Sequence, residues 1–206
     1  WGDTRNQDIN ELYTQLPVKF YNNSSNEKLT TEYNTASRLL EKLQFEEITA
    51  KKVFNSEQLG KFLAICHLWG AQHNLIVNNI KFYFNPVTAQ LEPIAFDACP
   101  NLEDFSPYQY FSNDFPEHSF WIKRALRDPA ISYNYIKYLD LYSRPSFVNK
   151  LKDYFGNEEL KYRKLLLKDL LFRDADEIFS NFSSLIYRDP WPILYERCAR
   201  VRREFS

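Results

Sequence analysis

The chain has 206 residues, a formal net charge of −1 and four glycines, and aromatic residues make up 17% of it. This length can bury a sizeable core, and the near-neutral charge excludes a general electrostatic attraction to nucleic acid or to an anionic membrane. So few glycines favour helices over turn-rich β-structure. No apolar run in the sequence approaches the roughly 18 residues of a membrane span.

The first segments of the chain have helical spacing. Apolar residues recur at helical intervals over residues 9–20, although Pro17 is expected to bend or end that segment. The polar cluster at residues 22–26 predicts a loop. A second amphipathic helix is expected over residues 32–45.

A more apolar helix and a β-hairpin follow. Asn55 is a typical N-cap residue for this helix, and Gly70 is expected to end it. The alternating bulky residues at 80–85, an Asn-Pro turn and the returning apolar stretch at 91–96 predict two antiparallel strands.

The polar residues that frame the hairpin suggest a site. Asn79 precedes the first strand and Asp97 follows the second. Antiparallel partners lie about 5 Å apart, so these two side chains are expected to face one small volume. Oxygen atoms of Asn and Asp are ligands for divalent cations. The plainer interpretation is a structural hairpin that covers a helical core, because strand ends often carry Asn and Asp.

The remainder of the chain again predicts helices. Residues 98–117 contain three prolines and are expected to be irregular. Prolines at 129, 145 and 190 stand where first-turn prolines are tolerated. We therefore expect one domain over residues 1–206, of the mainly α (α+β) class with one short hairpin. The helices are predicted at 118–127, 129–142, 145–154, 157–172, 174–186 and 190–204.

The cysteines do not indicate a metal site. Cys66, Cys99 and Cys198 show neither Cys-x-x-Cys spacing nor paired His ligands. Cys66 lies in an apolar helix and is expected to be a small buried residue. A disulfide between Cys66 and Cys99, which both flank the hairpin, is left open.

Residues 53–98, VFNSEQLGKFLAICHLWGAQHNLIVNNIKFYFNPVTAQLEPIAFDA, resemble the core of the CotH-type kinase family. The family shares a helix that ends in a small-residue turn, a His or Asp followed by Asn, a YxNPxT hairpin and an LEPIxFD or WD ending. An apolar helix, a polar loop and a short hairpin that ends in Asp also follow one another in the catalytic half of protein-kinase-like folds. The resemblance implies a bacterial spore-coat or cell-envelope protein of atypical kinase sequence.

The resemblance assigns roles to four residues. Asp97 resembles the family's metal-binding Asp, and Asn79 resembles the Asn of the catalytic loop, so both would hold Mg²⁺ and ATP. A kinase has its catalytic Asp five residues before that Asn. Here Asn74 occupies that position, with His73 beside it. Because an amide is a poor proton acceptor, His73 is the candidate base.

The resemblance also implies that part of the kinase fold lies elsewhere. A kinase places an ATP-binding Lys on a small β-rich lobe, whereas the residues before about 50 read as helical. The chain starts at Trp1 and has no Met, so we expect a piece of a longer protein, mostly the C-terminal lobe, inactive alone. The ATP-binding Lys would lie upstream of Trp1.

Two functional classes remain open on the sequence. In the first, the intact protein transfers phosphoryl groups from ATP to Ser or Thr of a coat or envelope protein. In the second, the chain is a pseudokinase-like binding or scaffold domain, which Asn74 and the missing small lobe favour. An unrelated helical domain with a chance hairpin is a third possibility.

Overall fold

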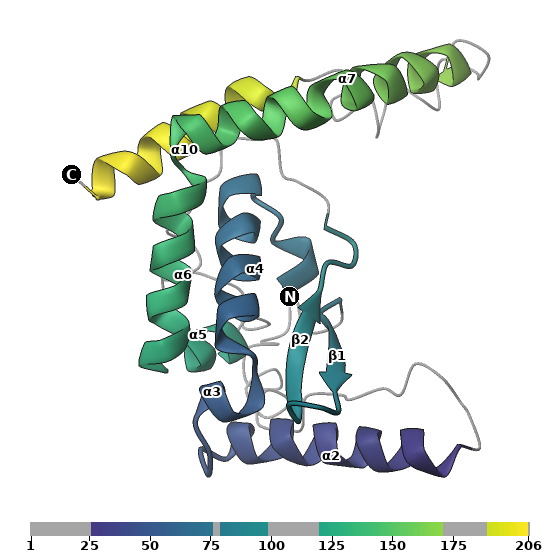
Figure 1. Cartoon of the computed structure of the whole chain (residues 1–206), viewed down its shortest axis with the longest axis vertical. Coiled ribbons are helices and arrows are strands. Elements are labelled where there is room, and N and C mark those ends of the chain that lie inside the picture. The colour runs from purple at the N-terminus through teal and green to yellow at the C-terminus, as the bar shows by residue number, and fades with distance from the viewer. Residues whose placement is uncertain (1–25, 76–78, 99–119, 171–188, 206) are drawn as a thin grey trace, which may run out of the picture.

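The computed structural model describes residues 26–75, 79–98, 120–170 and 189–205. Over these residues the fold is mainly helical with one antiparallel hairpin, as predicted (Figure 1). The predicted helices at 9–20 and 174–186 lie outside the described residues, as does nearly all of the irregular segment. The described elements are α2 (Glu27–Gln44), α3 (Ala50–Val53), α4 (Ser56–Trp69), the 3₁₀ turn η1 (His73–Leu75), β1 (Lys81–Asn85), β2 (Gln90–Ile94), α5 (Phe120–Leu126), α6 (Pro129–Tyr142), α7 (Pro145–Leu170) and α10 (Pro190–Glu204).

The caps of α4 are those that the sequence predicts. The side chain of Asn55 accepts a hydrogen bond of 3.1 Å from the Gln58 N–H. Gly70 ends the helix with φ 63°, a left-handed conformation that glycine adopts without a Cβ clash. The helix is therefore fixed at both ends, and the chain leaves it directly towards the hairpin.

Two Asp-Pro pairs start α6 and α10. The carboxylates of Asp128 and Asp189 each accept a backbone N–H in the first turn, and Pro129 and Pro190 are the first helical residues. Asp128 also accepts the Lys51 N–H at 2.8 Å, which ties α3 to the start of α6. Both helices have the predicted bounds.

Two predictions about helices were wrong in detail, and one short helix was not predicted. The two helices expected at 145–154 and 157–172 form one helix, α7, because Gly156 has no positive φ and lowers helix stability without ending the helix. Helix α2 starts at Glu27, five residues before the expected start, because Asn26 acts as its N-cap. The four residues of α3 were not predicted, since one turn has no recognisable period.

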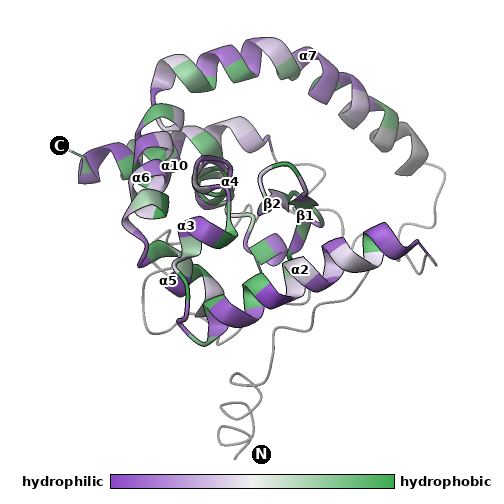
Figure 2. Cartoon of the chain, turned by 60° about the horizontal axis from the view of Figure 1, so that its bottom comes forward, coloured by the Kyte–Doolittle hydropathy of each residue, from purple (hydrophilic) through white to green (hydrophobic). Residues whose placement is uncertain are grey.

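Helix α4 lies in the middle of the molecule, between α6 and the hairpin (Figures 1 and 2). Most of its side chains are buried, so the helix is apolar on nearly all sides. Its end is held against α10 by an edge contact of 6.2 Å between the rings of Trp69 and Trp191. Every described helix is too short or too polar to cross a membrane.

The hairpin is attached to the core through its inner face. Phe82 contacts the rings of Phe54 and Trp121, with ring centroids 5.2 Å and 5.8 Å away. Leu91 is buried, pairs with Phe54 in a short parallel bridge and accepts the Asn55 N–H at 3.1 Å. The start of α4 and the hairpin are thus one packed unit, and this unit fixes the position of the hairpin ends.

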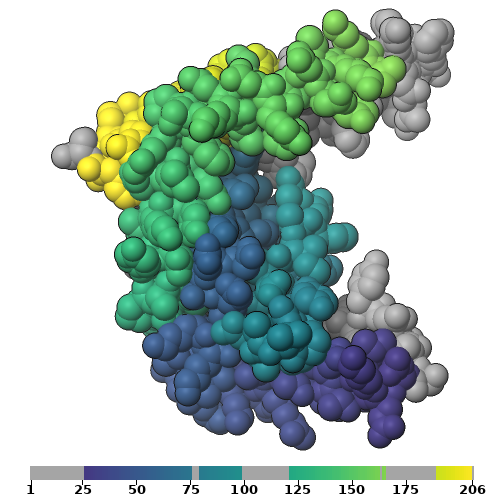
Figure 3. Space-filling model, viewed as in Figure 1, coloured from purple at the N-terminus to yellow at the C-terminus, as the bar shows by residue number. Residues whose placement is uncertain are grey.

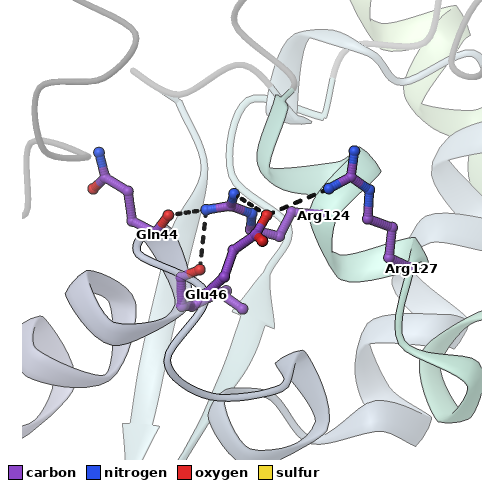
Figure 4. A network of polar contacts seen from close by, with 5 residues as sticks. Gln44, Glu46, Arg124 and Arg127 are labelled. Atoms are coloured by element: carbon purple, nitrogen blue, oxygen red, sulfur yellow. Dashed lines mark hydrogen bonds and ion pairs between the residues drawn. The ribbon is translucent and has the colours of Figure 1, made fainter.

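A network of polar contacts joins the end of α2 to α5 (Figure 4). The guanidinium of Arg124 donates to the carbonyl oxygens of Leu43 and Gln44 and to the carboxylate of Glu46. Arg127 adds a longer contact of 3.4 Å to Glu46. Arg124 thereby satisfies carbonyl groups that the helix end leaves without intrahelical partners.

In the space-filling view the surface is hollowed beside the hairpin, between α2 and the far half of α7 (Figure 3).

Candidate functional site

Three polar side chains meet at the open end of the hairpin. Asp97 Oδ2 lies 2.8 Å from His73 Nδ1 and 3.3 Å from Asn79 Nδ2. Asn79 Nδ2 also lies 2.9 Å from His73 Nδ1 and 3.0 Å from the His73 carbonyl oxygen. The expected proximity of Asn79 and Asp97 is therefore present, with His73 as a third member. We call these three residues the hairpin-end cluster.

The local backbone places the cluster. His73 begins the turn η1, and the indole N–H of Trp121 donates to the Leu75 carbonyl oxygen at 3.0 Å, which anchors this turn to the core. Asp97 has φ 52°, in the left-handed region that Asp adopts more readily than most residues. The chain therefore bends sharply just beyond β2, where the carboxylate meets His73.

His73 Nδ1 lies between an acceptor, the Asp97 carboxylate at 2.8 Å, and a donor, Asn79 Nδ2 at 2.9 Å. Because a hydrogen bond to a carboxylate is charge-assisted and therefore the stronger of the two, we assign the proton to Nδ1, which then donates to Asp97. Asn79 then donates to Asp97 and to the His73 carbonyl oxygen. The neutral imidazole consequently has its lone pair on Nε2. A ring held in this tautomer by a carboxylate can accept a proton at Nε2.

The side chain of Asn74 does not join the cluster. It is 1% exposed, and its amide exchanges contacts of 3.4 Å and 3.5 Å with the thiol of Cys66. Burial raises the pKa of that thiol to about 12, so the thiol stays protonated at neutral pH. His73 and Asn74 are adjacent in the chain, but their side chains lie in different surroundings. Asn74 is buried and anchors the turn, whereas His73 contacts Asp97.

Cys66 has a free thiol in the described structure. Cys99, its candidate disulfide partner, lies outside the described residues. The buried position expected for Cys66 is present. Through its contacts with the buried Asn74, Cys66 helps to anchor the turn that carries His73.

The hairpin-end cluster is open to solvent. The side chains of His73 and Asp97 are 56% and 45% exposed. A ligand can thus reach both groups without any movement of the core. An exposed carboxylate beside an oriented imidazole is able to bind a cation, to hold a polar ligand or to take up a proton.

The residues fit Mg²⁺ in chemical type. Among the described residues, no group of three or more His, Cys, Asp or Glu side chains is placed to hold a metal ion. Mg²⁺, however, commonly uses one or two protein carboxylates and completes its shell with water and substrate phosphates. Asp97 supplies such a carboxylate. Asn79 presents its amide nitrogen to Asp97, so it offers oxygen to a cation only after the amide turns over.

Two further residues border the cluster and were missed by the sequence analysis. The ammonium group of Lys81 lies 5.1 Å from the ring centroid of Phe96, the residue before Asp97. Lys81 follows Asn79 by two positions, and two residues of extended chain span at most about 7 Å. The two-residue spacing between Asn79 and Lys81 was the signal available in the sequence. It places Lys81 near the cluster only once the strand register is known, and this register pairs Lys81 with Ile94.

Comparisons with protein-family models, with curated proteins and with solved structures found no match. A functional proposal therefore rests on the hairpin-end cluster and on the resemblance carried by residues 53–98.

Proposed function

We propose that this chain is part of a CotH-like, kinase-like domain that binds Mg²⁺–ATP at the hairpin-end cluster and transfers a phosphoryl group to Ser or Thr. The observation that carries the proposal is the meeting of His73, Asn79 and Asp97 at one open surface, where Asp97 lies 18 residues after Asn79 and 24 after His73 in sequence. Phosphoryl transfer requires positioning and charge neutralisation more than covalent chemistry by the protein.

Asp97 and Asn79 are the residues that would hold Mg²⁺. When bound, Mg²⁺ neutralises charge on the phosphate oxygens. Asp97 contributes the carboxylate, and its contact with Asn79 keeps both groups at the same end of the hairpin. The exposure of Asp97 leaves room for water and phosphate oxygens in the rest of the shell.

His73 would act as the proton acceptor. Its Nδ1–H donates to Asp97, so Nε2 can take the proton from the hydroxyl of a Ser or Thr. The hydroxyl oxygen then forms a bond to the γ-phosphorus of ATP, the bond from that phosphorus to the β,γ-bridging oxygen breaks, and ADP leaves. In this assignment His73 replaces the carboxylate that kinases carry at the position of Asn74.

A second candidate function is a pseudokinase-like binding or scaffold domain. The burial of Asn74 against Cys66 favours it, because the position that resembles the catalytic Asp is directed into the core. Such a domain would keep nucleotide binding through Asp97 without phosphoryl transfer. In either case we propose a location in the bacterial cell envelope or spore coat, with a coat or envelope protein as partner.

Binding and turnover separate these functions. We expect the full-length protein to bind ATP in a Mg²⁺-dependent manner by titration calorimetry, and Asp97→Asn to weaken this binding about tenfold or more, as loss of a charged ligand does. Glu47→Gln, which removes an exposed carboxylate outside the cluster, is the matched control and should leave the affinity unchanged.

Phosphoryl transfer is followed with radiolabelled ATP. His73→Gln should keep ATP binding and lower the transfer rate about a hundredfold, the usual contribution of a general base. Mg²⁺–ATP binding that depends on Asp97 without any transfer would identify the scaffold function. Absence of Mg²⁺-dependent ATP binding in the wild-type protein would exclude both.

A further inference from the structure

Lys81 provides a positive charge at the same end of the hairpin as the cluster. It is the only basic residue between positions 79 and 98. Its ammonium group lies over the ring of Phe96, 5.1 Å from the centroid. Phe96 is 48% exposed, so the pair lies at the surface. A cation over an aromatic face is held in place by the negative face of the ring.

The hairpin register places this pair next to the cluster. Lys81 lies opposite Ile94 in the antiparallel pairing. Beyond this last pair, Asn79 lies two positions before Lys81, and Phe96 and Asp97 follow Ile94 by two and three positions. Two residues of extended chain span at most about 7 Å, so the Cα atoms of Lys81 and Asn79 are no farther apart than that. The side chain of a lysine covers this distance.

Electrostatics explains why a phosphate ligand needs such a group here. Asp97 is negative, and a polyphosphate beside it is repelled unless a positive charge intervenes. A divalent cation at Asp97 supplies part of that charge. An ammonium group is a strong point-charge ligand for the remaining phosphate oxygens.

We propose that Lys81, positioned over the ring of Phe96, binds phosphate oxygens of the nucleotide that the hairpin-end cluster holds through Asp97. This inference rests on the proposed function and adds to it a phosphate-binding residue within the described chain. Phe96 is a positioning residue in this arrangement, because it acts through the lysine. The ligand class is a polyphosphate, with inorganic tripolyphosphate and Mg²⁺–ATP as probes.

The test compares charge-changing variants by titration calorimetry on the full-length protein. Lys81→Met keeps the aliphatic stem and should weaken binding of Mg²⁺–ATP and of tripolyphosphate about tenfold, the typical effect of losing a charge-assisted hydrogen bond. Lys81→Arg keeps the charge and should retain most of the affinity. Phe96→Leu should give a smaller loss, because it keeps apolar bulk and removes the ring.

Lys52→Met is the matched control. Lys52 is an exposed lysine of α3, and α3 meets β2 near the turn of the hairpin, at the end away from the cluster, where Gln90 donates to the Lys51 carbonyl oxygen. Its loss removes the same charge from the protein without touching the cluster, so the affinity should not change. Thermal unfolding of each variant verifies that the fold is intact.

The outcomes for the two proposals differ. If Asp97→Asn weakens Mg²⁺–ATP binding and Lys81→Met does not, the role of Lys81 is overturned and the proposed function stands. If ATP does not bind while tripolyphosphate binds in a manner that depends on Lys81, the nucleotide function is overturned and the phosphate site stands. If the wild-type protein binds neither probe, both are overturned.

Discussion

Gly60 of α4 and Asn134 of α6 lie so close that a Cβ atom on Gly60 would stand 2.6 Å from the Cβ of Asn134. The same atom would lie 2.8 Å from the backbone nitrogen of Tyr135. Backbone atoms cannot move aside as the end of a flexible side chain can. The two helices therefore pack at a distance that only glycine permits, and α4 leads through Gly70 to the turn that holds His73.

Gly60→Ala should consequently destabilise the protein. We expect the free energy of unfolding to fall by about 1–3 kcal/mol, the usual effect of overpacking a core. Chemical denaturation followed by circular dichroism measures it. Gly156→Ala is the matched control, because a Cβ there meets only Lys152 Cγ, at an ordinary 3.7 Å. In that helix Ala should add up to about 1 kcal/mol of stability. Equal effects at both sites would contradict the close packing of α4 and α6.

The sequence predicted those parts of the fold that depend on local chemistry. Asn55 and Gly70 mark the ends of α4, and the prolines at 129 and 190 mark the starts of α6 and α10. The close approach at Gly60 has no local signal, since it depends on where α6 lies. The continuity of α7 was missed for a related reason: a glycine weakens a helix, and its neighbours decide whether the helix ends.

In the site, too, the features that depend on local sequence were predicted, and those that depend on tertiary contacts were not. Hairpin pairing brings Asn79 and Asp97 together, and that pairing was readable from alternation and turn residues. The different surroundings of His73 and Asn74 were not readable, because a 3₁₀ turn directs adjacent side chains differently according to tertiary contacts. A polar Asn next to a polar His gives no sign that one is buried against Cys66.

His67 gives the stability of the fold a pH dependence. Its imidazole is 5% exposed, and Nδ1 lies 2.5 Å from the hydroxyl of Tyr135. Burial, with a contribution from the positive charge of Arg197, lowers the pKa of His67 from 6.5 to about 4. The unfolded chain therefore takes up a proton between these pH values that the folded chain does not.

The expected result is a loss of stability as the pH falls. The contribution is fully present above about pH 6.5 and is lost progressively as the pH falls towards 4, in total about 3 kcal/mol for this difference in pKa. His67→Gln keeps an acceptor for Tyr135 and cannot take up the proton. Urea unfolding at pH 7.5 and 4.5 should show a smaller difference for this variant than for wild type. The same difference in both proteins would assign the acid sensitivity to other groups.

Asn74→Asp tests whether the position that resembles a kinase base can be restored. The substitution replaces a buried amide, which donates to Cys66, with a carboxylate that has no hydrogen bond to give when ionised. Burial raises the pKa of such a carboxyl, so at neutral pH the variant should lose about 2 kcal/mol or more of stability. This loss should diminish as the pH falls below the raised pKa, because the folded state then holds the proton.

Since the side chain of residue 74 points to Cys66 and not to the hairpin-end cluster, phosphoryl transfer by Asn74→Asp should not increase. Asn74→Leu, an apolar residue of similar volume, separates the loss of the amide contacts from the added charge, because its stability should not vary with pH relative to wild type. A stable Asn74→Asp variant with faster phosphoryl transfer would instead place residue 74 in the cluster and reassign the base from His73 to it.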